Sequence, residues 1–395
     1  MKIVCVGGGP AGLYAAILLR RRDPTHEVTV LEQNPAGSTH GWGVVYWNDL
    51  SESLAASDPE SARSIRDGSV PWTSQILDVN GRRTVHNGRG GHSIGRHRLL
   101  DILARRATDL GVQLHFTHEV DDLEEISDAD LIIASDGVGS RMRQHLGGDF
   151  KTSIVVGANK YIWLGTTKVF EGFTFAMVET KAGWIWLHGY AFDEHTSTCV
   201  VECTTDTWSR LDLDKLGTDD ATAAMAKIFA VALDGHPLMN QNSSWLNFRT
   251  VTNEKWHHGN VVLVGDAAHS THFTIGSGTK LALEDSIALV ARLHDGSDMT
   301  AALDAYEQER QAALVQPQSE ARLSAQWFEN IPRYHGLPDE EFFALLRERR
   351  SPLLARIPPR VYYHLHRATQ ESSVLRKLRE RIGPAARAVY SRRFH

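Results

Sequence analysis

Cysteine and long hydrophobic runs are scarce in this sequence. Its 395 residues contain 3 cysteines, and the spacing of Cys5, Cys199 and Cys203 fits no metal-ligand motif. No apolar stretch is long enough for a signal peptide or a membrane span. Low-complexity tracts and internal repeats are also missing. We therefore expect a globular protein in a reducing cytoplasm, with no bound metal and no membrane contact.

An excess of positive charge is missing as well. The formal net charge is -6, which argues against a basic nucleic-acid binder and leaves nucleic acid an unexpected partner. Hydrophobic residues make up 42% and charged residues 23%, the balance of a folded domain. A chain of this length exceeds one core, so we expect two domains and a smaller appendage. Monomer and homodimer both stay open.

The first part of the chain follows the pattern of a dinucleotide-binding fold. Strands are predicted over residues 2–6, 27–31, 131–134 and 261–264, and helices over 11–22 and 96–110 and from about Ser277 and Thr300. Residues 151–210 are rich in aromatic side chains, which favour β-strands. We therefore predict a discontinuous domain over 1–155 and 250–330, an inserted antiparallel sheet over 156–249, and a basic helical segment over 331–395.

A glycine loop lies between the first strand and the first helix. Gly7, Gly9 and Gly12 form a G-x-G-x-x-G motif, with Pro10 and Ala11 at the start of the helix. The glycines permit the tight turn, the approach of a pyrophosphate to the backbone and close helix packing. Glu32, followed by Gln33, ends the second strand, where a carboxylate accepts the ribose hydroxyls. The sequence therefore predicts a bound dinucleotide.

Three further motifs resemble those of the group A FAD-dependent aromatic hydroxylases, the p-hydroxybenzoate hydroxylase superfamily. They are the helix that begins at Arg96, the D-G-x-x-S-x-x-R pattern from Asp136 and Gly137 to Arg143, and Gly265-Asp266-Ala267-Ala268-His269. The resemblance implies an α/β fold in which a Rossmann-like FAD-binding domain carries an inserted antiparallel β-sheet substrate domain and a C-terminal helical segment. It also implies an FAD-dependent monooxygenase that uses O2, with NAD(P)H as a transient co-substrate, through a flavin 4a-hydroperoxide.

Residues around the second FAD motif have predicted roles. In such an enzyme Asp266 accepts a hydrogen bond from a ribityl hydroxyl. A helix that begins near Ser277, between Gly276, Gly278 and Thr279, directs its positive N-terminus at the flavin pyrimidine edge.

Other segments resemble a narrower subgroup. Phe273 stands where a proline is usual and Lys280 where an asparagine is usual. The segments 41–45, 159–163, 201–203 and 272–276 are similar to those of salicylyl-CoA 5-hydroxylase, 2-aminobenzoyl-CoA monooxygenase and the violacein-pathway tryptophan hydroxylase. The resemblance implies hydroxylation of salicylyl-CoA, with anthraniloyl-CoA or tryptophan as alternatives. Arginines at 347–350 and 376–381 are candidates for contact with CoA phosphates.

Candidate pocket residues come from both predicted domains. Trp42, Val45, Tyr161, Trp163, Trp186 and Phe273 are predicted to form an apolar wall that keeps water from the reacting centre. His272, His188 and Tyr190 are candidates to bind the ring substituent or carry its proton. Glu202 is either a buried partner of an arginine or an amine, or an edge-strand carboxylate that faces water.

Two rival functions remain open at the level of sequence. The segment Trp184-Ile185-Trp186-Leu187 is similar to the W-x-W-x-I-P motif of flavin-dependent halogenases, but His188 and Gly189 replace its last two residues. The second rival is a flavin-binding protein without turnover.

Overall fold

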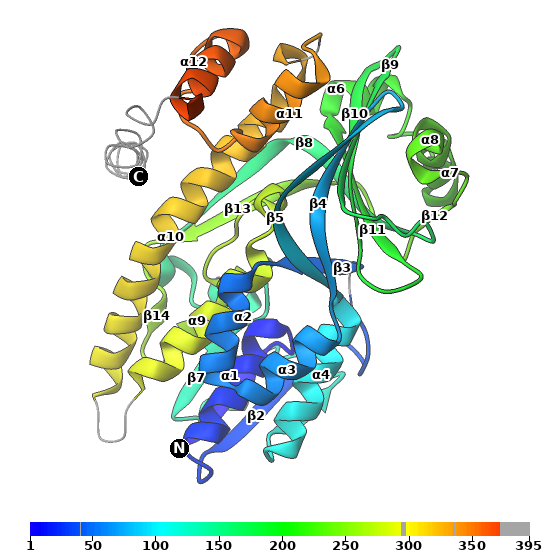
Figure 1. Ribbon diagram of the computed structural model, residues 1–395. Helices are drawn as coiled ribbons and strands as arrows, with labels where there is room; N and C mark the ends of the chain where they lie inside the picture. The colour runs from blue at the N-terminus through cyan, green and yellow to red at the C-terminus, as the bar shows by residue number, and fades with distance from the viewer. Residues whose placement is uncertain (40, 294–297, 335, 372–395) are drawn as a thin grey trace.

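The computed structural model describes residues 1–39, 41–293, 298–334 and 336–371. Two β-sheets form its frame, and a long helix, α10 (Met299–Glu329), runs along both of them (Figure 1). The predicted arginine stretch 376–381 lies outside the described residues. Within the described part of the chain, no helix has both the length and the apolar character needed to cross a membrane.

The first sheet has six strands in the order β14-β15-β7-β1-β2-β6. The strands are β1 (Lys2–Val6), β2 (Glu27–Glu32), β6 (Gln113–Phe116), β7 (Leu131–Ala134), β14 (His257–His258) and β15 (Val261–Leu263). All pairings are parallel except that of β14 with β15. The predicted Rossmann strands are thus confirmed, and β15 joins this sheet from a later part of the chain.

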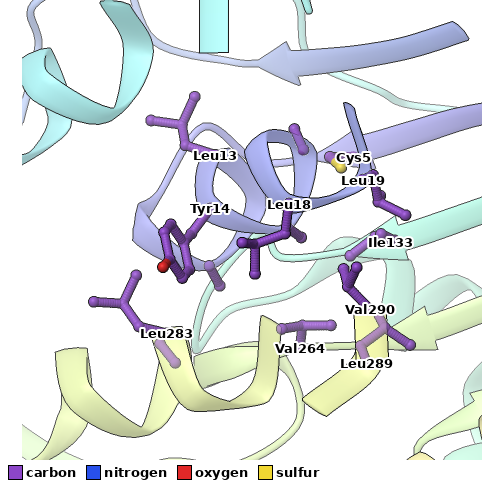
Figure 2. Packing of buried hydrophobic residues seen from close by; sticks show 14 of the residues in the cluster. Cys5, Leu13, Tyr14, Leu18, Leu19, Ile133, Val264, Leu283, Leu289 and Val290 are labelled. Carbon is purple, nitrogen blue, oxygen red and sulfur yellow. The ribbon is translucent and has the colours of Figure 1, made fainter. Parts of the chain in front are cut away.

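Helices α1 (Pro10–Arg22), α4 (Arg96–Asp109) and α9 (Gly278–Arg292) pack around this sheet. Helix α1 buries every residue from Ala11 to Leu19 because α9 and the sheet cover it together (Figure 2). Its last turn holds three arginines, which favour the negative C-terminal end of the helix dipole. Helices α9 and α10 begin within one residue of their predicted starts.

The second sheet has the order β12-β8-β11-β10-β9-β4-β5-β3, and β13 pairs with β8. Its strands are β3 (Gly43–Tyr46), β4 (Val70–Val79), β5 (Arg82–Gly95), β8 (Thr152–Thr166), β9 (Phe173–Thr180), β10 (Gly183–Ala191), β11 (Ser197–Thr204), β12 (Leu238–Met239) and β13 (Leu246–Asn253).

This second sheet differs from the prediction in two ways. Strands β3, β4 and β5 come from residues 43–95, which the sequence pattern assigns to the first domain, and β8 begins already at Thr152. The sheet is also not wholly antiparallel, because β4 runs parallel to β9. Residues 70–95 join this sheet because Asn80 and Gly81, both with positive φ, turn β4 into β5, and the Asn80 N–H donates to the Met177 carbonyl of β9 at 2.9 Å.

The two faces of the second sheet have different covers. One face packs on α6 (Thr205–Arg210), α7 (Thr218–Ile228) and α8 (Ala230–Leu233) through Ile185, Leu187 and Val201. The other face packs Trp186 and Phe175 with the end of α10, α11 (Asp339–Arg347) and α12 (Pro359–Glu371). The remaining helices are α2 (Asn48–Ser57), α3 (Pro59–Asp67) and α5 (Arg141–His145).

Candidate active site

The glycine loop has the geometry that its motif predicts. Gly7 has φ +107°, and a Cβ there would lie 2.5 Å from the Ser135 carbonyl oxygen. A Cβ on Gly12 would lie 2.1 Å from the Gly7 carbonyl oxygen, so helix α1 approaches the turn as closely as only glycine permits. A Cβ on Gly9, in contrast, would meet nothing within 4 Å. The loop is therefore closed on its protein side and open at Gly9.

Glu32 lies at the end of β2, beside this loop. Its Oε2 accepts the Gly8 N–H at 2.7 Å, and its Oε1 accepts the backbone and side-chain N–H groups of Asn34 at 2.8 and 2.6 Å. The neighbouring Gln33 is exposed. These bonds hold the carboxylate at the position where the sequence predicts contact with a ribose.

The Gly265–Asp266 segment lies across the same loop. A Cβ on Gly265 would lie 3.2 Å from the Cβ atoms of both Ala11 and Ala282, so the two cofactor motifs meet at α9. The Asp266 side chain is exposed, yet burial raises its pKa, with His269 and Arg96 lowering it and Asp285 raising it further. The carboxyl is thus reachable by solvent although many protein atoms surround it.

Arg96 and Asp136 carry buried polar atoms without a partner among the described residues: the Nε of Arg96 and the Oδ1 of Asp136. Burial lowers the pKa of Arg96, against the raising effect of Asp266. The Asp136 Oδ2 accepts the backbone N–H groups of Arg141 and Met142. Gly137, with φ +82°, has no atom within 4 Å of a Cβ. Unsatisfied buried groups beside an open glycine turn fit a polar ligand.

A buried network supports the Gly265–Asp266 segment from behind. Asp285 is fully buried, and its Oδ2 accepts the Gly265 N–H at 3.0 Å and a hydrogen bond from His269 Nε2 at 2.7 Å. Arg310 of α10 donates to the Asp285 Oδ1 at 2.7 Å. Burial raises the pKa of Asp285, but His269 and Arg310 bring it below its usual value. Sequence reasoning missed this network, because its members are far apart in the chain.

The N-terminus of α9 faces the second sheet. Gly276 has φ +63°, and a Cβ there would lie 2.8 Å from the Val45 Cγ2. The residues from Gly276 to Lys280, including Gly278 and Thr279, are all partly accessible. Lys280 forms an ion pair of 2.6 Å with Asp49 of α2, so the lysine ties α9 to α2.

Two arginines of the predicted phosphate-binding stretch hold the loop before α9. Arg349 donates to the carbonyl oxygen of Thr274 at 2.9 Å, and Arg350 to that of Ile275 at 3.4 Å. Burial and the charge of Arg350 lower the pKa of Arg349 to about 9, while Glu320 raises it. Arg347, by contrast, is exposed. The C-terminal segment therefore takes part in shaping this site.

Glu202 forms a polar centre on the face of the second sheet that packs on α10. It is 1% exposed, on a strand between two others, which excludes the predicted edge-strand carboxylate facing water. Its Oε1 accepts a hydrogen bond from Asn159 Nδ2 at 2.8 Å, and its Oε2 one from Trp186 Nε1 at 2.9 Å. His188 Nε2 lies 3.4 Å from the same Oε2. The structure gives Glu202 these three partners in place of an arginine.

His272 and Phe273 lie beside this centre, in front of α9. The Phe273 ring contacts the rings of His272, Tyr161 and His188 at centroid distances of 4.4, 4.9 and 5.8 Å. Burial lowers the pKa of His272 to about 4, with Glu202 raising it and His188 lowering it. Burial, and to a smaller degree Asp266, raises the pKa of Tyr161. Four of the predicted pocket residues are thus brought together.

The remaining predicted residues have mainly packing contacts. Tyr190 is buried, and its hydroxyl donates to the Gly43 carbonyl at 2.7 Å. The Trp42 ring lies on Gly165 and the Trp163 ring on Gly41, where a Cβ would lie 2.4 and 2.5 Å from the rings. Both indole N–H groups lack a partner within the described part of the chain. These contacts explain why residues 41 and 165 are glycines.

The parallel sheet and the glycine loop together define a dinucleotide-binding domain of the Rossmann type. A family model described as an FAD binding domain matches residues 1–317. The chain belongs to this family of FAD-dependent monooxygenases, with FAD as its cofactor and NAD(P)H as the co-substrate typical of the family. The predicted resemblance and enzyme class are thereby confirmed.

Three relatives are similar over most of the chain. A salicyloyl-CoA 5-hydroxylase of Streptomyces is 38% identical over 85% of this chain, which spans 66%, just under two thirds, of that relative. A 3-hydroxy-4-methyl-anthranilyl-[aryl-carrier protein] 5-monooxygenase of Streptosporangium sibiricum is 34% identical, over 84% of this chain and 90% of the relative. The protodeoxyviolaceinate monooxygenase of Chromobacterium violaceum is 30% identical, over 89% and 95%.

The fold is also found among solved structures. The crystal structure of a mutant 2-methyl-3-hydroxypyridine-5-carboxylic acid oxygenase has a TM-score of 0.69 at 20% identity and covers 91% of this chain and 97% of its own. This likeness confirms the predicted fold class.

Proposed function

We propose that this monooxygenase hydroxylates an aromatic ring whose carboxyl group is held as a thioester, with salicyloyl-CoA as the first candidate. The observation that carries the proposal is the contact of Phe273 with His272, His188 and Tyr161 beside the α9 N-terminus. An apolar site with a few fixed polar groups suits an aromatic ring that bears one polar substituent. The names of two relatives support the thioester, because each names an aryl group attached to CoA or to a carrier protein.

Residues of the first sheet are proposed to hold FAD. Gly7, Gly9, Gly12, Pro10 and Ala11 would bind the pyrophosphate at the N-terminus of α1. The other proposed cofactor contacts are Glu32 and Gln33 at the ribose, with Arg96, Asp136, Gly137, Gly265 and Asp266 along the cofactor and Gly276, Gly278 and Thr279 at its flavin end. When bound, the reduced flavin supplies the activation of O2.

The protein's own residues are proposed to orient the ring and exclude water. We propose that Val45, Tyr161 and Phe273 form the wall of the substrate pocket, because the Trp186 indole N–H already donates to Glu202. His272 and His188 would bind the ring substituent. Tyr190 would not, because its hydroxyl already donates to the Gly43 carbonyl. The division into an FAD-binding domain, a substrate domain with β3–β5 included, and a C-terminal segment belongs to the same proposal.

The alternatives have less support. The Trp184–Leu187 segment resembles the halogenase motif, but Trp186 packs on Phe328 at 5.8 Å and bonds to Glu202, which accounts for it as packing. The violacein-pathway relative is named for protodeoxyviolaceinate rather than tryptophan. The cytoplasmic location stays a prediction.

Steady-state kinetics test the proposal. We expect salicyloyl-CoA to stimulate NAD(P)H oxidation and to yield a product heavier by one oxygen atom, hydroxylated para to the ring hydroxyl, the position most activated toward an electrophile. The comparison set is salicylate, 2-aminobenzoyl-CoA, the salicyl thioester of a carrier protein, and tryptophan. Equal or better turnover of salicylate or tryptophan would overturn the thioester assignment and leave the monooxygenase class intact.

A further inference from the structure

Glu202 determines which nitrogen of His188 carries a proton. Burial raises the pKa of Glu202, but the hydrogen bond from His188, the positive charge that either histidine carries when protonated, and the Asn159 amide bring it below its usual value. The ionised carboxylate can only accept hydrogen bonds. In the neutral form of His188 the hydrogen is therefore assigned to Nε2, 3.4 Å from the Glu202 Oε2, which leaves a lone pair on Nδ1.

Thr274 fixes the opposite arrangement on His272. The Thr274 backbone N–H donates to His272 Nδ1 at 3.5 Å, and the Thr274 hydroxyl lies 3.0 Å from the same nitrogen. An Nδ1 that accepts hydrogen bonds places the hydrogen of the neutral ring on Nε2. The lowered pKa of His272, about 4, keeps this ring neutral near pH 7. His272 Nε2 is thus a hydrogen-bond donor, and His188 Nδ1 is a hydrogen-bond acceptor.

The two histidine rings share one aromatic neighbour. Both rings contact Phe273, and the pKa of His272 responds to both His188 and Glu202. Among the residues that the structure describes, neither His188 Nδ1 nor His272 Nε2 has a hydrogen-bond partner. Each can therefore bond to a group of the substrate.

We propose that His188 and His272 together select a ring hydroxyl over a ring amino group, with Glu202 and Thr274 as the positioning residues. The inference rests on the proposed function and narrows its substrate class to phenols. A phenolic oxygen can donate to His188 Nδ1 and accept from the His272 N–H. The lone pair of an aromatic amine is delocalised into the ring, so the amine donates to His188 but leaves the His272 N–H unsatisfied, which is costly in a buried site.

Binding to the oxidised holoenzyme tests the selection without turnover. Salicyloyl-CoA and 2-aminobenzoyl-CoA are titrated in turn, with the change in flavin absorbance as the readout. Salicylate and anthranilate repeat the comparison without the CoA group. We expect the hydroxyl compound of each pair to bind about tenfold more tightly, the effect of one unsatisfied hydrogen bond. Equal or tighter binding of the amines would overturn the inference.

Variants separate positioning from a structural effect. Glu202→Gln should weaken binding of the hydroxyl compound and leave binding of the amine nearly unchanged. The ratio of the two dissociation constants should therefore approach one. Thr274→Val should act in the same direction, and Thr274→Ser, which keeps the hydroxyl, should restore the preference. A loss of affinity of equal size for hydroxyl and amine, in both Glu202→Gln and Thr274→Val, would show a merely structural role.

The outcome is distinguishable from failure of the proposed function. Hydroxyl preference in binding without any stimulated NAD(P)H oxidation by the thioesters would leave the selection standing and refute the proposed reaction. Turnover of salicyloyl-CoA together with equal binding of the amine would refute the selection and leave the proposed reaction standing.

Discussion

The guanidinium of Arg349 donates to the main-chain carbonyl of Thr274, 75 residues earlier in the chain, at a distance of 2.9 Å. Its other acceptors are the Ser324 hydroxyl and the Leu346 carbonyl, all uncharged oxygens. A cation in such surroundings has few alternative positions, so it fixes the loop that carries His272 and Phe273. The basic stretch at 347–350 thus contributes at least one residue to the site from inside the fold.

Arg349→Met should loosen this loop. We expect FAD to stay bound, the free energy of unfolding to fall by about 1–3 kcal/mol because the carbonyls lose a charged donor, and more NAD(P)H to be consumed per product formed. Hydrogen peroxide yield and urea unfolding measure both effects. Arg347→Met, at an exposed side chain close by in the sequence, is the matched control and should change neither. Normal coupling in the Arg349 variant would refute the role of this contact.

His272→Ala should uncouple oxidation from hydroxylation. The ring lies against Phe273 and within reach of the charge of Glu202, so its loss should leave FAD occupancy near that of the wild type. Product formed per NAD(P)H should drop severalfold, with the remainder released as hydrogen peroxide. The product-to-NAD(P)H ratio, measured by chromatography and peroxide assay, decides this. An unchanged ratio would remove His272 from the site.

The depressed pKa of His272 should also appear in the pH dependence of stability. The pKa of His272 is about 4 in the folded state and about 6.5 in the unfolded state. Between pH 4 and pH 6.5 the unfolded chain therefore binds a proton at this residue that the folded protein does not bind. The stability gained from the neutral ring is present above pH 6.5 and is lost as the pH falls toward 4, by about 3 kcal/mol.

The comparison with His272→Gln isolates this group from other acids. The difference in unfolding free energy between wild type and variant should shrink by that amount from about pH 7 to about pH 4. A difference that stays constant across this range would mean that His272 titrates normally.

Gly9→Val should yield apoprotein that is still folded. A Cβ on Gly9 would meet no atom within 4 Å, so the added side chain should not disturb packing but should block approach of the pyrophosphate. Flavin content after purification and circular dichroism measure the two effects. Gly148→Val, at another glycine with open surroundings, should retain FAD. Full occupancy in the Gly9 variant would refute the assigned phosphate loop.

Asp285→Asn should weaken both the fold and cofactor binding. The change leaves the buried Arg310 without its nearest carboxylate, and we expect a loss of about 3 kcal/mol. The FAD dissociation constant should rise because Asp285 also holds the Gly265 N–H. Glu309→Gln, in the exposed pair with Arg292, should cost less than about 0.5 kcal/mol. Equal effects of the two variants would argue against the network.

The sequence predicts the cofactor loops well because their chemistry is local. Gly7 to Gly12 and Glu32 carry their own turn and strand signals, and the structure places them side by side. The pair Asn80–Gly81 was an available hairpin signal that would have located β4 and β5. Strand β9, which pairs with β4, lies about 100 residues further along the chain, and no local sequence pattern predicts that parallel pairing.

The polar centre of the site lay beyond sequence reasoning for a different reason. Glu202 stands in an apolar strand, and its role depends on Asn159, Trp186 and His188, which come from two other strands. The same residue on an edge strand would have faced water. Asp285 and Arg349 likewise look like ordinary helix residues until the fold shows what they touch.

The return of the chain to the first sheet has a consequence for synthesis. Strand β7 is flanked by β1 and by β15, and β15 is synthesised only after every strand of the second sheet. Until then the fully buried segment Leu131–Ala134 presents an unpaired apolar edge. Such an edge attracts other chains, and late long-range pairing slows folding. A nascent chain that stalls before Val261 is therefore expected to aggregate more readily than the complete chain.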